Sequence, residues 1–476
     1  MIRNIEDVRG RTVLIAGFTP RSGAGASRLL SRLSCRIRIW DEKPASALAA
    51  AFKKAKDVRF ERKFLGSDSK FSASALKGTD LVVLSPGVPL TRPLLRSAGK
   101  KGIPIISEVE LAWLYKPVKW ICISGTDGKT TTTTLAGLVF RAAGKRAVVA
   151  GNIGLSLCEA VLKPGPEPEY IVAELSSFQL ETIGTLKPFI AVVLNITPDH
   201  LDRYPDLDAY ASAKARIWMN QTDRDFLVVK EDDANIRRMI AKFPPRSAVI
   251  RFSRTKKLRE GAFIDRGRMV FRFEGKTKRV SGAGDLKIRG EHNKENVLAV
   301  IAAAGLAELD PGRVAGVLKK FGGVEHRCEP AGIIKGRRFI NDSKATTLNA
   351  VRMALLSMPG KVILLMGGRD KGDDFKRIEP EVKKSVKTLV LFGESAGLID
   401  KRLAFGSKIR TGTMSEAVRE AYRLSGRGDI ILLSPGCASF DEFRNFEERG
   451  RVFKRLVRSL AARRPKRSRG IREKKS

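Results

Sequence analysis

The stretch WICISGTDGKTTTT, residues 120–133, decides the fold class of the chain. An apolar run ends in a glycine-containing turn, and a lysine and a row of threonines follow. A strand, a tight turn and a helix start in this order form an anion cradle, because the loop N–H groups and the helix N-terminus converge on one point. We therefore expect Lys129 to neutralise phosphate charge and the Thr130 hydroxyl to bind Mg²⁺.

The turn does not satisfy the standard P-loop pattern, G-x-x-x-x-G-K-[ST]. Counting back from Gly128, the first glycine should be residue 123, which is an isoleucine, and Gly125 comes two residues too late. The stretch is therefore either a chance match or a shorter phosphate loop. The strand before it, the helix after it and the Gly-Lys-Thr triplet favour phosphate binding over an ordinary turn with a solvated lysine.

Apolar runs of the same kind recur along the chain and alternate with helix-length segments. They are TVLIAGF, RIRIWDE and LVVLSPG in the first part, WICISGT, YIVAELSS and IAVVLNI in the middle, and KVILLMGG, LVLFGE and DIILLSPG in the last part. This alternation is typical of βαβ units, so we expect an α/β fold with parallel sheets. Ligands of such sheets bind at the carboxyl ends of strands, where the candidate site residues are therefore sought.

The three series of strands predict three α/β domains, in line with a length of 476 residues. We place the domains at residues 1–116, 117–323 and 324–462. Residues 245–290 are expected to form an antiparallel insertion in the middle domain, because charged and β-forming residues alternate there. Residues 463–476 are expected to be a basic, disordered tail.

The charge is strongly positive, with 90 Lys and Arg against 51 Asp and Glu, a net charge of +39. Nucleic-acid binding is one interpretation, and a general basic bias with anionic substrates is the other. Most of the cations are dispersed, and the clustered ones in RRPKRSRGIREKKS (463–476) come without aromatic residues that could stack on bases. A solvated tail is therefore preferred to an RNA-binding or anionic-surface-binding one.

The class of protein follows from composition and from the chain start. With 43% hydrophobic residues the chain is globular, and MIRNIEDVRG has no apolar core that a signal peptide would need. No apolar run approaches the length of a membrane span. The five cysteines lack C-x-x-C spacing, so we expect reduced thiols in a cytoplasmic protein.

Polar residues follow the strands of the middle domain. Glu174 ends YIVAE, and Asp199 and His200 follow IAVVLNI. A buried carboxylate is expensive unless it is paired or bound to a metal, and this set suits Mg²⁺ or Mn²⁺ beside phosphates. Lys214, on the expected helix AYASAKARIW, is by itself better interpreted as solvated.

The chain has only three histidines, His200, His292 and His326. None of them lies on an apolar face, and each occurs after a strand or at a domain junction, which favours site roles. In the last domain Asp342, Lys344 and Thr346 follow one strand, Lys371 follows another and Ser439, Phe440 and Phe446 follow a third. Hydroxyls and lysines at three strand ends fit a small anionic substrate such as an amino acid.

With these residues the chain resembles the Mur ligases, ATP-dependent amide-forming enzymes of peptidoglycan synthesis. The resemblance covers essentially the whole chain. The family's short GT-x-GK-[ST] loop accounts for the isoleucine at position 123. GNIG, ELSSFQLE, NITPDHLDR, HNKEN, EHR and NDSKATT recur in order. INDSKATT, GGRDK and LLSPGCASFDEFRNFEERG are similar to the D-glutamate-adding branch, and neither the D-N-P-R nor the HHP signature of other branches is present.

The resemblance implies a reaction and a domain arrangement. ATP would phosphorylate the carboxylate of UDP-N-acetylmuramoyl-L-alanine, and the D-glutamate amine would displace phosphate from the acyl phosphate intermediate. A Rossmann-like N-terminal domain would bind the UDP-sugar, a P-loop-type ATPase domain with a parallel sheet would bind ATP, and a Rossmann-like C-terminal domain would bind the amino acid. Two Mg²⁺ ions, or Mn²⁺, would assist in a protein expected to be a monomer.

The resemblance also implies roles for individual residues. Lys129, Glu174, His200 and Lys214 would be catalytic; Thr130 and Glu174 would hold one metal and His200 the other, supported by Lys214 as a carbamate. The nucleotide would contact Gly125, Thr126, Asp127, Gly128, Lys129, Thr130, Thr131, Asn293, Asn296, Arg327, Asp342 and Lys344. The UDP-sugar would contact Arg21, Ser22, Asp41, Lys43, Ser85 and Asn152. D-Glutamate would contact Thr346, Lys371, Ser439, Phe440 and Phe446.

Two features depart from the family pattern. Asp127 stands where the family often has asparagine, which adds a negative charge beside the phosphates. The loop GFTPRSGAGAS is expected to be longer than the usual glycine-rich turn.

The alternative function is a catalytically weakened paralogue with a basic nucleic-acid-binding surface. A third interpretation, folylpolyglutamate synthase, is disfavoured by the complete N-terminal α/β domain.

Overall fold

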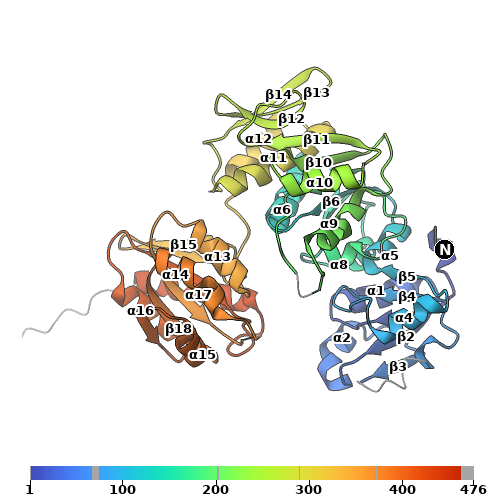
Figure 1. The fold of residues 1–476 in the computed structure, drawn as a ribbon, viewed down its shortest axis with the longest axis horizontal. Helices are drawn as coiled ribbons and strands as arrows, with labels where there is room; N and C mark the ends of the chain where they lie inside the picture. The colour runs from blue at the N-terminus through green and yellow to red at the C-terminus, as the bar shows by residue number, and fades with distance from the viewer. Residues whose placement is uncertain (1, 67–73, 201–202, 289, 371, 463–476) are drawn as a thin grey trace, which may run out of the picture. The chain divides into compact units, whose positions relative to one another are not determined.

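The computed structural model describes residues 2–66, 74–200, 203–288, 290–370 and 372–462 (Figure 1). The chain divides into two compact units, Met1–Phe321 and Gly322–Ser476. The described residues contain three sheets, of five, nine and six strands. The expected α/β fold with parallel sheets is confirmed.

The first sheet has the strand order β3-β2-β1-β4-β5, and all its pairs are parallel. Because β2 lies on one side of β1 and β4 on the other, the chain changes direction at β1, where ligands of such sheets bind. The strands are β1 (Thr12–Ala16), β2 (Arg36–Asp41), β3 (Arg62–Leu65), β4 (Leu81–Leu84) and β5 (Ile105–Ser107). The helices are α1 (Ser22–Arg32), α2 (Ala49–Lys54), α4 (Pro93–Lys100) and α5 (Glu108–Tyr115).

The prediction of a long N-terminal loop at GFTPRSGAGAS is wrong. Helix α1 begins at Ser22, so SGAGAS belongs to the helix and only the residues before it form the turn. The two helical glycines are explained by close packing: a Cβ on Gly23 would lie 2.9 Å from the Cα of Phe18, and one on Gly25 would collide with the Ser156 hydroxyl. Sequence alone interpreted these glycines as turn formers.

The second sheet has the order β14-β13-β12-β11-β10-β9-β6-β8-β7. Strand β6 lies between β8 and β9, so the chain again changes direction where the phosphate loop begins. The strands are β6 (Lys119–Ser124), β7 (Ala147–Gly151), β8 (Tyr170–Glu174), β9 (Ile190–Val193), β10 (Phe226–Lys230), β11 (Ala248–Ser253), β12 (Gly261–Asp265), β13 (Arg268–Phe273) and β14 (Lys276–Gly282). The helices are α6 (Lys129–Ala142), α7 (Leu157–Val161), α8 (Ser177–Leu180), α9 (Leu207–Ala215), α10 (Ala234–Lys242), α11 (Glu291–Leu306) and α12 (Pro311–Lys320).

The antiparallel insertion expected at 245–290 is shorter than predicted. Strand β11 pairs parallel with β10, and the antiparallel pairs are β12 with β13 and β13 with β14. Each hairpin turns through a residue and a glycine that both have positive φ, first Arg266 and Gly267 and then Glu274 and Gly275. Such two-residue turns match the strand twist of a hairpin. Figure 1 shows the extension beside α11 and α12.

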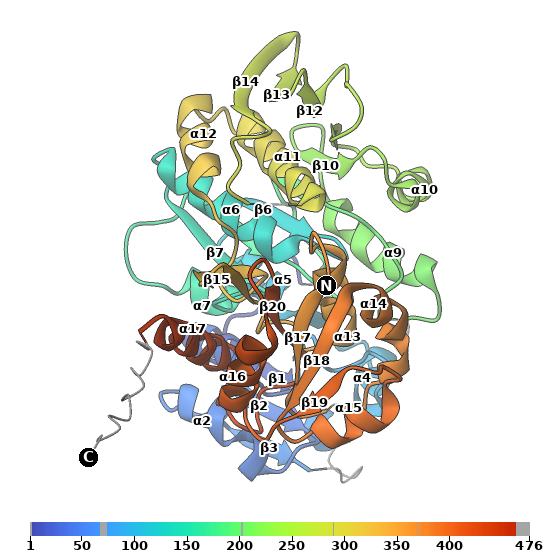
Figure 2. The same ribbon diagram turned by 90° about the vertical axis from the view of Figure 1, so that its left-hand side faces the viewer.

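The third sheet has the order β15-β16-β20-β17-β18-β19, with only β15 antiparallel to its neighbour. Figure 2 shows α16 and α17 on one face and α13, α14 and α15 on the other, and each face has its own core. The strands are β15 (Glu329–Ile334), β16 (Arg337–Asn341), β17 (Val362–Gly367), β18 (Val386–Phe392), β19 (Lys408–Arg410) and β20 (Ile430–Gly436). The helices are α13 (Leu348–Leu356), α14 (Glu379–Ser385), α15 (Ala396–Arg402), α16 (Met414–Leu424) and α17 (Phe446–Ala462).

Each of the predicted spans 1–116, 117–323 and 324–462 contains one of these sheets. The two compact units separate between Phe321 and Gly322, and the division into three domains stays a prediction. Among the described residues, no helix has the length and apolarity to span a bilayer. The predicted tail, residues 463–476, lies outside the described residues.

Candidate active site

The phosphate loop connects Ser124, at the end of β6, to Lys129, at the start of the 14-residue helix α6. Gly125 and Gly128 have φ values of 146° and 82°, which only glycine adopts without strain. A Cβ on Gly128 would also collide with the side-chain oxygen of Asn296 from α11. The loop is therefore tight, and the positive end of α6 faces it.

Lys129 is folded over this loop. Its Nζ donates to the carbonyl oxygen of Gly125 at 2.7 Å and also to that of Thr126. Thr130 and Thr131 are buried in the first turn of α6. A cation and the N–H groups of a helix start thus lie together, as phosphate binding requires.

Asn195, which sequence reasoning missed, holds the loop from the end of β9. Its Oδ1 accepts from the backbone N–H of Thr126 at 3.1 Å and of Asp127 at 2.8 Å, and its Nδ2 donates to the Asp127 carbonyl at 3.2 Å. The Thr126 hydroxyl accepts from the N–H of Thr197 at 3.0 Å. The motif NITPDHLDR contains the signal, an amide directly after a strand, but only its charged residues were singled out.

Glu174 ends β8 and is 2% exposed. Its Oε1 accepts from the Asn152 side chain at 3.1 Å. Its Oε2 is buried and has no hydrogen-bond partner among the residues that the structure describes. A buried carboxylate oxygen without a donor is unfavourable. Glu174 therefore fits a cation ligand, and Asn152, expected to contact the UDP-sugar, orients it.

Lys214 is 1% exposed, so its interpretation as a solvated lysine is wrong. Its Nζ donates to the Gly125 carbonyl at 2.8 Å and lies 4.6 Å from the centre of the Tyr210 ring. Burial, and then the nearby Lys129, lower the pKa of Lys214 well below its usual value, against the opposing effect of Asp127 and Asp199. A lowered pKa favours the neutral amine, which is the nucleophilic form of lysine.

His200 lies at the edge of this site. Its backbone is left-handed, with φ 54°, and its ring centre is 4.7 Å from that of Phe178. Nε2 lies 3.6 Å from a carboxylate oxygen of Asp199, and 43% of the side chain is exposed. An accessible imidazole beside a carboxylate can serve as a metal ligand.

Arg203 and Glu181 form an ion pair of 2.7 Å that sequence reasoning also missed. Both side chains are mostly buried, and Arg203 also donates to the Pro86 carbonyl at 2.9 Å, in the turn after β4. Tyr204 donates to the second oxygen of Glu181 at 2.6 Å. The first two sheets are therefore linked beside the site.

Asn293 and Asn296 lie in the first turns of α11 and contact each other, Nδ2 of Asn296 donating to Oδ1 of Asn293 at 3.1 Å. Asn296 packs against Gly128, which brings the pair to the phosphate loop. Burial lowers the pKa of the neighbouring His292. The start of α11 thus presents side-chain amides beside the phosphate loop, where the resemblance to the Mur ligases implies nucleotide contacts.

The residues expected to bind the UDP-sugar only partly come together. Ser85 donates to the Gly17 carbonyl at 2.6 Å and lies 3.0 Å from the Ser22 hydroxyl, and Asp41 accepts from the Phe18 N–H at 2.7 Å. These side chains surround the end of β1. The Arg21 guanidinium instead donates to the Gly151 carbonyl at 2.7 Å, next to Asn152. The backbone N–H of Lys43 donates to Asp41 at 2.9 Å, and its side chain is exposed.

In the second unit, Asp342 is buried at the end of β16. It accepts from the Ser434 hydroxyl at 2.8 Å and from the Cys328 N–H at 3.1 Å, and burial raises its pKa to about 6. Lys344 Nζ lies 5.7 Å from the centre of the Phe446 ring. Of the remaining expected residues, Ser439 is buried, Thr346 is half-buried, Arg327 and Phe440 are exposed, and Lys371 lies outside the described residues.

His326 is buried among charged and amide side chains. Its Nδ1 lies 2.9 Å from the Asn341 amide, and Glu325 and Glu329 are close enough to form a metal-ligand group with it. Lys454 donates to both carboxylates, at 2.6 and 2.8 Å. Because the Lys454 ammonium already bonds both carboxylates, the group is better explained as an ion-pair network.

Comparisons with known proteins agree with this geometry. The family model of the Mur ligase middle domain matches residues 123–304, and that of the Mur ligase glutamate ligase domain matches 326–437. A relative from Pelotomaculum thermopropionicum named UDP-N-acetylmuramoylalanine–D-glutamate ligase is 41% identical over 459 residues, 96% of this chain and 99% of its own. One of the same name from Geobacillus kaustophilus is 41% identical, covering 94% and 98%.

A solved structure, UDP-N-acetylmuramate-alanine ligase from Thermotoga maritima, shares the fold with a TM-score of 0.57 and 18% identity, covering 94% of this chain and 99% of its own. The relatives that are 41% identical and span nearly the whole chain show the family. The chain belongs to the Mur ligase family.

Proposed function

We propose that this protein joins D-glutamate to UDP-N-acetylmuramoyl-L-alanine at the expense of ATP, in cytoplasmic synthesis of peptidoglycan precursors. Relatives at about 40% identity that span nearly the whole chain carry the name of this activity. The structural observation that carries the proposal is the cluster of Lys129, Lys214 and Glu174 at the phosphate loop. A nucleotide-binding module has no need of the buried lysine and the unpartnered carboxylate oxygen.

A carboxylate is a poor acylating agent because its leaving group would be oxide. In the first step, an oxygen of the alanyl carboxylate forms a bond to the γ-phosphorus of ATP, and the bond to the ADP oxygen breaks. In the second step, the D-glutamate nitrogen forms a bond to the acyl carbon, phosphate leaves, and the nitrogen loses a proton. Lys129 and the N–H groups of the α6 start stabilise charge on the phosphoryl oxygens.

The metal-binding residues of the proposal are Thr130, Glu174, His200 and Lys214. The orphaned Oε2 of Glu174 supports this set, since it has the chemistry of a hard-cation ligand. Two Mg²⁺ ions, or Mn²⁺, held by these residues would supply positive charge that offsets the charge of the phosphoryl oxygens.

Lys214 acts as a carbamate in this proposal. The neutral amine forms a bond to the carbon of CO₂ and loses a proton, which converts a buried base into a buried anion. The lowered pKa of Lys214 supports this step, because only the unprotonated amine attacks CO₂. The carbamate oxygens would then help to hold the second metal.

The remaining contacts follow the resemblance, in a protein that acts as a monomer. The nucleotide contacts Gly125–Thr131, Asn293, Asn296, Arg327, Asp342 and Lys344. The UDP-sugar contacts Ser22, Asp41, Lys43, Ser85, Arg21 and Asn152. D-Glutamate contacts Thr346, Lys371, Ser439, Phe440 and Phe446.

Phosphate release from ATP by the purified protein tests the proposal. We expect release only when UDP-N-acetylmuramoyl-L-alanine and D-glutamate are both present, with one amide product per phosphate. L-Glutamate, L-alanine and UDP-N-acetylmuramate as replacements are the specificity controls, and Lys129→Ala is the inactive control. Turnover with a different amino acid would refute the substrate assignment. A folded protein without turnover on any of these would favour the weakened paralogue.

A further inference from the structure

Arg449, on α17, is among the largest fully buried side chains of the described residues, with 0% exposure. Within the described residues, its guanidinium donates only to uncharged oxygens. Nε donates to the Ser343 hydroxyl at 3.1 Å, and Nη2 donates to the carbonyls of Ser343 at 2.9 Å and Cys437 at 3.1 Å. Nη1 donates to the Ala438 carbonyl at 3.3 Å. Burial lowers the pKa of Arg449 to about 10, so the group stays charged at neutral pH.

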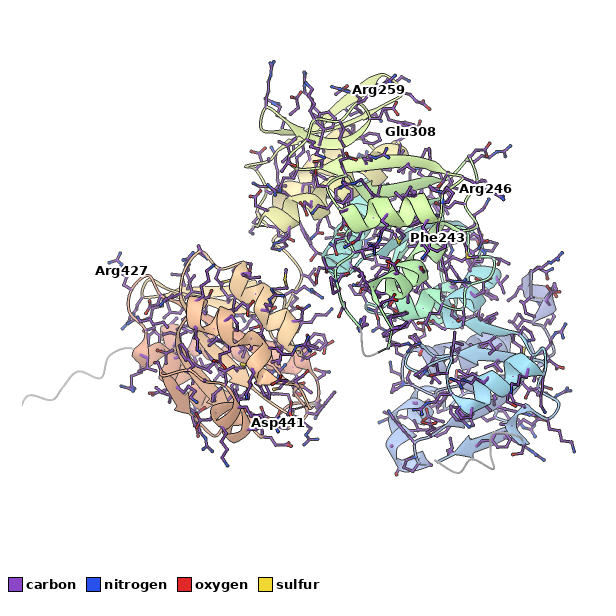
Figure 3. The ribbon with its side chains drawn as sticks, viewed as in Figure 1. Phe243, Arg246, Arg259, Glu308, Arg427 and Asp441 are labelled. Carbon is purple, nitrogen blue, oxygen red and sulfur yellow. The ribbon has the colours of Figure 1, made fainter. Side chains whose placement is uncertain are left out.

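The acceptors belong to two loops that end adjacent strands. Ser343 follows β16 and lies between Asp342 and Lys344, whereas Cys437 and Ala438 follow β20 and directly precede Ser439. The strands β16 and β20 are paired in parallel, so both loops leave the same edge of the sheet. In Figure 3, the labelled Asp441 marks the end of the unit where these loops lie, and the labelled Arg427 lies at the opposite end.

A third loop is held at the same place. Gly368, after β17, lies so close that a Cβ there would be 3.1 Å from Nη1 of Arg449 and would collide with the Ala438 carbonyl. Arg369 and Ala438 exchange two backbone hydrogen bonds, of 2.9 and 3.0 Å. The Ser343 hydroxyl, itself bonded by Arg449, donates to the Phe446 carbonyl at 2.8 Å.

Burying a guanidinium without a directly paired carboxylate is unfavourable unless its donors are satisfied. Arginine suits this place because its planar fork presents five donors in fixed directions, which lysine cannot do. Side chains that bind a small substrate need such a supporting layer, since small displacements weaken binding strongly.

We propose that Arg449 is a positioning residue for the amino-acid pocket: its guanidinium sets the spacing between the loop of Lys344 and Thr346 and the loop of Ser439. This inference rests on the proposed function for the identity of the pocket. It assigns Arg449 no contact with substrate. Its effect is transmitted through the backbone of residues 343 and 437–438.

The kinetic test compares Arg449→Lys and Arg449→Met with the wild type. We expect KM for D-glutamate to rise about tenfold or more in Arg449→Met and less in Arg449→Lys, because lysine retains the charge but not the fork. KM for the UDP-sugar should stay within about twofold, because its expected contacts lie in the first unit. Lys454→Met is the matched control, since it removes a cation of the same helix that bonds Glu325 and Glu329, and its KM values should equal those of the wild type.

Amide hydrogen exchange measures the loops independently of activity. In Arg449→Lys, amides of 343–346 and 437–439 should exchange faster, while the core of β17 and β18 stays protected. If Arg449→Met does not fold, Arg449→Lys alone carries both measurements. Wild-type KM and wild-type exchange in a folded variant, or an equal rise in KM for D-glutamate and for the UDP-sugar, would overturn the positioning role. Failure of the wild type to use D-glutamate would instead refute the proposed function, and the exchange result would still stand.

Discussion

Lys214 shows how burial alone changes what a residue can do. On a small-residue helix its sequence context suggested a solvated cation, yet its Nζ is enclosed and shares the Gly125 carbonyl with Lys129. Two ammonium groups at one carbonyl repel each other, and this repulsion adds to desolvation in favouring the neutral amine. The lowered pKa of Lys214 therefore depends on residues far away in the chain.

Replacing Lys214 by arginine should abolish most of the activity, by about 100-fold or more, because arginine stays charged and takes up no CO₂. Wild-type protein in ¹³C-labelled bicarbonate should give a carbamate carbon signal in NMR that Lys214→Arg lacks. Lys242→Arg, on an exposed part of α10, is the control and should retain both activity and signal. A fully active Lys214→Arg enzyme would exclude a role for the carbamate.

Asp127 has its backbone N–H and carbonyl engaged by Asn195, so the loop geometry does not depend on its side chain. Asp127→Asn should therefore fold normally and lower KM for ATP a few-fold, because it removes a negative charge near the phosphates. Steady-state kinetics at several salt concentrations measure this, and the difference should shrink as salt rises. An increased KM would indicate that the carboxylate helps to hold the metal.

Helices α5 and α7 are joined through Glu108, the first residue of α5. Its carboxylate accepts from the Cys158 N–H at 2.8 Å, in the first turn of α7, and satisfies an amide that the short helix cannot. Burial raises the pKa of Glu108 to about 7. The contact joins α5 to α7, and the burial of this carboxyl costs stability as pH rises from about 4.5 to 7.

Glu108→Gln should remove this pH dependence. Between about pH 4.5 and 7 the folded protein retains a proton that the unfolded chain releases, so wild-type stability falls as pH rises through that window. The variant, which retains the acceptor oxygen, should match the wild type near pH 4.5 and exceed it above pH 7 by up to roughly 3 kcal/mol.

Tryptophan fluorescence during urea unfolding measures this difference, because Trp40, Trp113, Trp120 and Trp218 all lie in the first unit. Lys116→Gln, which removes a surface ion pair with Glu167, should change stability by less than about 1 kcal/mol at either pH. A Glu108→Gln difference that is independent of pH would contradict the argument.

The Lys and Arg residues behind the net charge of +39 are distributed over both units, and they are most concentrated in residues 463–476. Deleting 463–476 should leave turnover unchanged and lower the salt concentration at which the protein elutes from heparin, because fewer counterions are released on binding. A large loss of turnover would refute the solvated-tail interpretation. A truncation of 469–476 as an intermediate should give an intermediate elution.

Sequence by itself determined the strands, the phosphate loop and the polar residues at strand ends, because apolar runs, glycine turns and helix starts depend on near neighbours. Only tertiary structure decided how those residues act together. Lys214 and Gly125 are 89 residues apart, Asn152 and Glu174 lie on different strands, and Arg449 reaches Ser343 across 106 residues. Burial and hydrogen-bond satisfaction are properties of the packed chain. The lowered pKa of Lys214, the unpartnered oxygen of Glu174 and the buried guanidinium of Arg449 therefore follow only from the tertiary structure, which brings distant strand ends to one edge of a sheet.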